Sequence, residues 1–296
     1  MELFIKWFCF YNEFDGVFKD IKNITYATVK GDLLSLQAYN ALGIRNYSDI
    51  DILVSVVNLD NIEKILYKHG FSSNQKSRLE RISLIANAHQ IAPLECQITP
   101  WGKLKIDLNF DIFWGEYEGK RIDIEEFLSD TIEMDIYGVK VKTLPPIKAM
   151  MQLILHHYKD MNSIFLLATR NSIKYSMFKD VYHLLKNNLD SITIDKLYAK
   201  SKEYDIIPYV FYVLYYTGQI FDDEILEQYI EAFRTPDGEA LLDCYGLCAK
   251  ERKKWRCDFK TRLETDNLYE LIKNDLTDKD QEKIAINKRL FMGESE

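Results

Sequence analysis

The chain has few of the residues that interrupt regular structure, with 12 glycines and 6 prolines among 296 residues. This scarcity excludes a collagen-like or low-complexity chain. Cysteine is also sparse: the five cysteines form no Cys-x-x-Cys pair, and Cys244 and Cys248 lack nearby histidine or cysteine partners for a zinc site. We therefore expect free thiols in a reducing compartment, which predicts a cytoplasmic protein.

An excess of positive charge is missing as well. The chain carries 38 Lys and Arg against 46 Asp and Glu, a formal net charge of −8. Because DNA-coating proteins gain their affinity by neutralising phosphates, this balance argues against general DNA binding. It leaves room for one local basic surface.

Long apolar runs are absent too. The apolar stretch at residues 1–11 contains a glutamate and a lysine, and it is far shorter than the ~20 residues of a membrane span. We expect it to form an amphipathic helix packed on the body of the protein, and we expect no membrane association.

What the first half of the chain does contain is a mixture of strand and helix patterns. β-rich runs predict strands at Thr25–Val29 and Ile50–Val57, a hairpin of Ile91–Thr99 with Leu104–Phe113, and a pair of Thr131–Ile136 with Val139–Lys142. Helical spacing predicts Asp32–Ala41, with Asp32 as its cap, and Leu59–His69.

The character changes at Pro145-Pro146, after which the pattern is helical. The predicted helices are Ile147–His157, Met177–Lys186, Thr193–Tyr204, Pro208–Tyr216 and Asp222–Phe233, followed by a charged C-terminal segment. We therefore predict an α+β protein: a small mixed β-sheet core with flanking helices in residues 1–144, then an all-helical domain in residues 145–296.

Two aspartates mark the start of the second predicted strand. Asp49 and Asp51 are separated by one residue, so in a strand their side chains point to the same face. Two carboxylates so close repel each other, and a divalent cation between them removes that repulsion; Mg²⁺ prefers such oxygen ligands. Asp107, on the polar face of the second hairpin strand, is a candidate third ligand. The alternative for Asp-x-Asp is a turn and helix-cap arrangement without metal.

The residues around these acids resemble the uncharacterised nucleotidyltransferase family of the DNA polymerase β-like superfamily. The resemblance covers roughly residues 25–220. It is carried by Lys30-Gly31, Arg45-x-x-Ser48-Asp49-Ile50-Asp51-Ile52-Leu53-Val54, Lys68-His69-Gly70-Phe71, Ile106-Asp107-Leu108-Asn109-Phe110, the segment from Leu144 to His156-His157, Phe178-Lys179-Asp180, and Asp195-Lys-Leu-Tyr-Ala-Lys.

The resemblance implies a fold, a reaction and a set of site residues. It implies that Asp49, Asp51 and Asp107 hold two Mg²⁺ ions, or Mn²⁺ in their place, with a bound nucleoside triphosphate such as ATP. Asp107 would bind the metal nearer the acceptor and help to deprotonate its hydroxyl. The expected nucleotide-binding residues are Lys30, Gly31, Arg45 and Ser48, although Lys30 is equally consistent with a plain exposed lysine.

Two positions depart from the superfamily pattern. Asn46-Tyr47-Ser48 stands where a Gly-Ser or Gly-Gly pair usually precedes the first aspartate, which leaves the phosphate-binding loop hard to place. Asn109 stands where the family tends to have histidine. Asp111 is the alternative third carboxylate.

The expected reaction transfers a nucleoside monophosphate from a triphosphate to a hydroxyl-bearing acceptor and releases pyrophosphate. The acceptor is open: a small molecule, a tRNA or a protein. One alternative is a toxin-like transferase that modifies tRNA or protein. The other is a non-catalytic nucleotide-binding or partner-binding module on the same fold.

Two further features belong to the helical half. Residues 250–262 carry seven basic and two acidic residues; read as one helix, Trp255, Phe259 and Leu263 form an apolar stripe beside Arg252, Arg256 and Lys260. That helix is either a solvated flank or a docking surface for RNA. His156 and His157 end an apolar helix, so one of them must point toward the core, and either could contact the nucleotide or acceptor.

Overall fold

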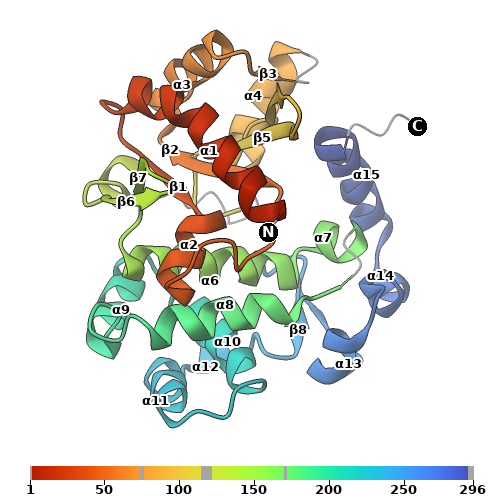
Figure 1. Ribbon diagram of the computed structural model, residues 1–296. Helices are drawn as coiled ribbons and strands as arrows, with labels where there is room; N and C mark the ends of the chain where they lie inside the picture. The colour runs from red at the N-terminus through yellow and green to blue at the C-terminus, as the bar shows by residue number, and fades with distance from the viewer. Residues whose placement is uncertain (1, 74–76, 115–121, 170–171, 293–296) are drawn as a thin grey trace. The chain divides into compact units, whose positions relative to one another are not determined.

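The computed structural model describes residues 2–73, 77–114, 122–169 and 172–292. These residues form two units (Figure 1). The first comprises residues 2–114 and 122–149, and the second comprises 150–292, in each case as far as they are described. The predicted domains 1–144 and 145–296 stay a prediction.

The first unit is built on a mixed sheet of seven strands among the described residues, in the order β3-β4-β5-β2-β1-β7-β6. Strand β2 runs parallel to β5, and β1 runs parallel to β7; the other neighbours are antiparallel. The strands are β1 (Tyr26–Val29), β2 (Asp49–Val54), β3 (Ser72–Ser73), β4 (Leu94–Ile98), β5 (Gly102–Asn109), β6 (Ile132–Ile136) and β7 (Val139–Thr143).

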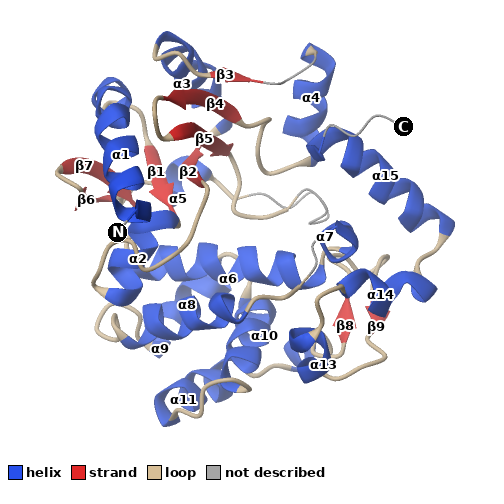
Figure 2. Cartoon of the chain, turned by 45° about the vertical axis from the view of Figure 1, so that its right-hand side comes forward, coloured by secondary structure: helices blue, strands red, loops and turns tan. Residues whose placement is uncertain are grey.

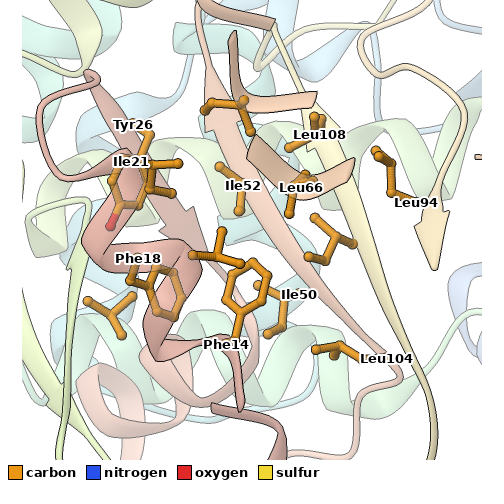
Figure 3. Packing of buried hydrophobic residues seen from close by; sticks show 14 of the residues in the cluster. Phe14, Phe18, Ile21, Tyr26, Ile50, Ile52, Leu66, Leu94, Leu104 and Leu108 are labelled. Atoms are coloured by element: carbon orange, nitrogen blue, oxygen red, sulfur yellow. The ribbon is translucent and has the colours of Figure 1, made fainter. Parts of the chain in front are cut away.

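Helices flank this sheet: α1 (Glu2–Ile21), α2 (Gly31–Tyr39), α3 (Val56–Lys68), α4 (Arg78–Asn87) and α5 (Ile124–Phe127). Figure 3 shows α1 side chains such as Phe14 and Phe18 packed beside Ile50 and Ile52 of β2 and Leu104 of β5. All five are buried. This contact confirms the predicted packing of an amphipathic first helix, since burial of apolar surface is what holds such a helix in place.

Several predicted boundaries are corrected by the structure. Strand β2 ends at Val54 and α3 begins at Val56, so the predicted strand is too long and the predicted helix too short. Asp32 is not the cap of α2, because Lys30 occupies that position. Its buried carboxylate instead accepts hydrogen bonds from the Tyr47 hydroxyl and from the backbone N–H of Gly43, at 2.9 Å in the latter case.

The second unit is mainly helical, as predicted (Figure 2). Helix α6 (Pro146–Asn162) leads into it from the first unit. The remaining helices are α7 (Ile164–Thr169), α8 (Tyr175–Lys186), α9 (Ile194–Glu203), α10 (Ile207–Gly218), α11 (Glu224–Phe233), α12 (Pro236–Glu239), α13 (Phe259–Glu264), α14 (Leu268–Ile272), the 3₁₀ turn η1 (Lys273–Asp275) and α15 (Asp278–Met292). A small antiparallel pair, β8 (Cys244–Tyr245) with β9 (Lys253–Lys254), interrupts them.

The predicted helix over residues 250–262 is wrong. The segment contains β9, turns, and enters α13 only at Phe259. The Asp258 carboxylate caps this helix by accepting from the Thr261 N–H. The predicted stripe therefore does not lie on one helix. Among the described helices, none is both long enough and apolar enough to cross a lipid bilayer.

Candidate active site

The parallel pair of β2 and β5 brings the predicted acids together. In its register Asp49 lies opposite Lys105, and Asp51 lies opposite Asp107. Residues of a strand alternate between its two faces, and Ile50 and Ile52 belong to the core face. Asp49, Asp51 and Asp107 therefore share the other face of the sheet.

Two lysines and an amide compensate these carboxylates. Nζ of Lys30 donates to Oδ1 of Asp51 at 2.9 Å, and Nδ2 of Asn109 donates to the same oxygen at 3.1 Å. Nζ of Lys105 lies 3.7 Å from Oδ2 of Asp49 and 3.3 Å from Oδ1 of Asp107. Three carboxylates against two ammonium groups leave one formal negative charge.

Burial makes that charge costly. Asp107 is only 7% exposed, and burial raises the pKa of its carboxyl to about 6; Lys105 opposes this rise, while Asp51 and Asp49 add to it. Burial also raises the pKa of Asp49, with the charge of Asp51 as the next cause. Burial lowers the pKa of Lys105, but Asp107 and Asp49 outweigh it, so that pKa is raised. An added cation would therefore be stabilised at the face of the sheet that carries these three carboxylates.

Lys30 reaches the acids through an unusual backbone conformation. Strand β1 ends at Val29, and Lys30 has φ 59° and ψ −145°, a region that non-glycine residues seldom occupy and that costs of order 1–3 kcal/mol. Gly31 follows at φ 49° and opens α2. The sharp turn from β1 into α2 therefore places the Lys30 ammonium against Asp51.

Tyr47 lies in the loop where the resemblance led us to expect a glycine pair. Its ring stacks on Trp7, with centroids 3.9 Å apart, and it fills the space beside Gly31, where an added Cβ would lie 3.2 Å from the ring. Burial, followed by nearby Tyr11 and Asp32, raises the pKa of its hydroxyl, so the hydroxyl stays protonated and donates to Asp32. A large aromatic side chain thus anchors the loop before β2.

The predicted nucleotide-binding residues lie at the same end of the sheet. Nη1 of Arg45 approaches the carbonyl oxygen of Gly31 at 3.4 Å, and Lys30 contacts Asp51. Ser48 is exposed and directly precedes Asp49, the first residue of β2. Their roles stay predictions.

Sequence reasoning missed Lys105 and Asn109 as members of this site. The signal was present, because both share the alternating polar face of β5 with Asp107. Asp111 does not lie on that strand, which ends at Asn109; its Oδ1 accepts from the backbone N–H of Phe113 at 2.9 Å. The structure thus gives Asp111 a local role in the chain that follows β5.

The oxygen chemistry of the acids fits a hard divalent cation. Oδ1 of Asp107 is buried and accepts no hydrogen bond from any residue that the structure describes. Nζ of Lys105 lies 3.3 Å from this oxygen as an ion pair, and a divalent cation would compensate the buried charge further. Asp49, Asp51 and Asp107 present the oxygen-only ligand set that suits Mg²⁺.

In the second unit, His157 is 5% exposed and His156 is half-buried. This confirms that one of the two histidines points toward a core. Some residues of the basic segment make local contacts: Lys253 pairs with Asp280 at 2.8 Å, and Arg256 pairs with Asp275. Arg262 is 2% exposed.

Comparison with known proteins supports the class of protein. The sequence pattern of the family described as uncharacterised nucleotidyltransferase matches residues 9–222. This chain belongs to that family, and the family supports a transferase of nucleotidyl groups acting on a nucleoside triphosphate. One similar solved structure is an antigenic nucleotidyltransferase-like protein from Paracoccidioides brasiliensis, with 17% identity, a TM-score of 0.40, and coverage of 72% of this chain and 87% of that one. No curated protein matches the chain.

Proposed function

We propose that the protein is a Mg²⁺-dependent nucleotidyltransferase that moves a nucleoside monophosphate from a triphosphate to a hydroxyl-bearing acceptor. The observation that carries this proposal is the register of β2 with β5, which puts Asp49, Asp51 and Asp107 on one face. The five cysteines are free, which favours a reducing compartment such as the cytoplasm.

The cationic groups around the acids have roles in this proposal. Lys30 and Arg45 lie at the turn into α2 and the loop before β2, where they neutralise triphosphate oxygens. Gly31 keeps the backbone of that turn open, and Ser48 donates its exposed hydroxyl. Lys105, paired with Asp49 and Asp107 in the free protein, is available to the departing pyrophosphate once those carboxylates bind cations.

Asp49, Asp51 and Asp107 would hold the metal, which when bound neutralises the triphosphate and polarises its phosphorus. The acceptor hydroxyl oxygen forms a bond to the α-phosphorus, and the bond to the bridging oxygen of pyrophosphate breaks. A carboxylate oxygen of Asp107 takes the hydroxyl proton. The electron pair of the broken bond leaves with pyrophosphate, so charge and atoms balance.

The toxin-like alternative stays open, because five of the seven basic residues in segment 250–262 are exposed: Lys250, Arg252, Lys254, Arg256 and Lys260. Within that segment Lys253 and Arg256 pair with acids, although Arg256 stays largely exposed, and Arg262 is buried. The choice among small-molecule, tRNA and protein acceptors therefore depends on experiment. The non-catalytic alternative predicts nucleotide binding without pyrophosphate release.

The test is the Asp49→Asn, Asp51→Asn double variant. Each labelled triphosphate is incubated with Mg²⁺ and cell extract, and both the labelled fraction and pyrophosphate release are measured. We expect the double variant to lose at least about 100-fold in rate, since even indirect metal partners are worth 10–100-fold. The control is Glu95→Gln on neighbouring β4, whose carboxylate pairs with Lys103. Normal turnover by the double variant would contradict the proposal.

A further inference from the structure

A second group of metal-ligand side chains lies on α6, within the second unit. His156, His157 and Asp160 each offer one ligand atom, and these atoms all lie within 4.8 Å of one another. From this group we propose a Zn²⁺ site, separate in chemistry from the carboxylates of β2 and β5.

The spacing along the helix brings the three side chains to one turn. His156 and Asp160 are four residues apart and His157 and Asp160 three, so both pairs share a helix face. The two imidazole rings have centroids 5.8 Å apart and are inclined by 50°. Rings that bind one tetrahedral metal through nitrogen have centroids roughly 5–6 Å apart, given Zn–N bonds of about 2.0–2.1 Å.

The distance between the facing side-chain atoms of His156 and Asp160 matches the distance between two ligand atoms of a tetrahedral zinc ion. Nε2 of His156 lies 3.4 Å from Oδ2 of Asp160. That separation is long for a charge-assisted hydrogen bond, which is about 2.7–2.9 Å. Two ligand atoms bound to one zinc ion at about 2.0–2.1 Å lie about 3.3 Å apart.

The surroundings of the group also suit a zinc ion. The side chain of Asp160 is 8% exposed and that of His156 21%, while His157 is 5% exposed overall. Oδ1 of Asp160, the oxygen other than the one facing His156, lies 3.9 Å from Nζ of Lys159, which is beyond hydrogen-bond distance. Three protein ligands with water as the fourth complete a tetrahedron.

The ligand types separate this site from the acidic one. Two imidazoles and one carboxylate favour a borderline metal such as Zn²⁺, whereas the three aspartates favour Mg²⁺. Because all three ligands belong to one helical turn, the bound metal would fix α6 near its C-terminal end. We expect it to raise the melting temperature of the protein.

The test measures Zn²⁺ binding to the untagged full chain after removal of metal with a chelator. Competition with a chromogenic chelator gives stoichiometry and affinity, and Co²⁺ in place of Zn²⁺ gives the visible absorption of a tetrahedral site. We expect one Zn²⁺ per chain, and an affinity reduced at least about 100-fold in His156→Ala and in Asp160→Asn. Circular dichroism shows whether each variant is folded, and His156→Ala changes the more exposed histidine.

Two controls separate this site from others. His183→Ala removes a histidine of α8 outside the group, and Asp49→Asn with Asp51→Asn removes the acidic ligands; both should retain zinc. The proposal is overturned if folded His156→Ala and Asp160→Asn keep full affinity, if the wild type binds no zinc, or if zinc is lost with Asp49 and Asp51. Each result is independent of nucleotidyl transfer, because no triphosphate is used.

Discussion

Replacing Asp107 by asparagine should stabilise the metal-free protein. Burial raises the pKa of Asp107 from 3.8 to about 6 in the folded state. This difference of about 2.2 pH units corresponds to about 3 kcal/mol at 1.36 kcal/mol per unit. Asparagine has nearly the same shape and no charge, so Asp107→Asn should raise the free energy of unfolding by up to about 3 kcal/mol at pH 8.

The direction in which stability changes with pH follows from proton binding. Between the unfolded pKa near 3.8 and the folded pKa near 6, the folded protein holds the Asp107 proton more tightly than the unfolded chain does. The stability contributed by this group is therefore fully present below pH 3.8 and is lost as pH rises through 6. The advantage of Asp107→Asn should fall to about half its value at pH 5. Lys105 loses one partner in the variant, which reduces the gain.

Urea unfolding in the presence of EDTA measures this effect at both pH values. Glu95→Gln, which removes a carboxylate from neighbouring β4, should change stability by no more than about 0.5 kcal/mol. A destabilised Asp107→Asn at pH 8, or a gain that does not change with pH, would refute the reasoning. Addition of Mg²⁺ and triphosphate should stabilise the wild type and leave Asp107→Asn nearly unchanged.

Two further substitutions test the site and the second unit. Asn109→Ala removes the 3.1 Å hydrogen bond to Asp51, so Mg²⁺ affinity measured by calorimetry should fall about 10–100-fold; unchanged affinity would show that Asn109 does not orient that carboxylate. Arg262→Met removes a buried guanidinium that lies over the Tyr216 ring and donates to its hydroxyl at 3.0 Å, and thermal melts should show a loss of about 1–3 kcal/mol. Arg256→Gln, at a largely exposed side chain, should cost about 0.5 kcal/mol or less, and an equal loss in both variants would contradict the role of burial.

The sheet was largely predictable because strand patterns are local. The predicted strand Leu104–Phe113 corresponds to β5, although β5 ends earlier, at Asn109, and the Asp-x-Asp before the apolar run corresponds to β2. Helix α4 was missed, although Ser77 and Glu80 form the Ser-x-x-Glu signal of a helix start and Oγ of Ser77 accepts from the Glu80 N–H at 3.1 Å.

The failures have a common physical origin in contacts between residues that lie beyond one helical turn of each other in the sequence. Aspartate is a typical helix-capping residue. The Asp32 carboxylate, however, accepts hydrogen bonds from Tyr47 and Gly43, which are more than ten residues away. The spacing of Trp255 and Phe259 is typical of an apolar helix face. Pairing of β9 with β8 nevertheless prevents a helix in this part of the chain. Local periodicity contains no information about either partner.

The same distinction explains why the acids were predictable and Lys105 was not. A strand has a period of two, so a one-residue slip of β2 would move Ile50 and Ile52 out of the core and bury Asp49 and Asp51 in it. The apolar core therefore fixes the direction of the carboxylates. Lys105 meets Asp49 only because β5 is the parallel neighbour of β2. The alternation within β5 puts Lys105 on the face of Asp107, but its contact with Asp49 depends on strand order, which that alternation does not specify.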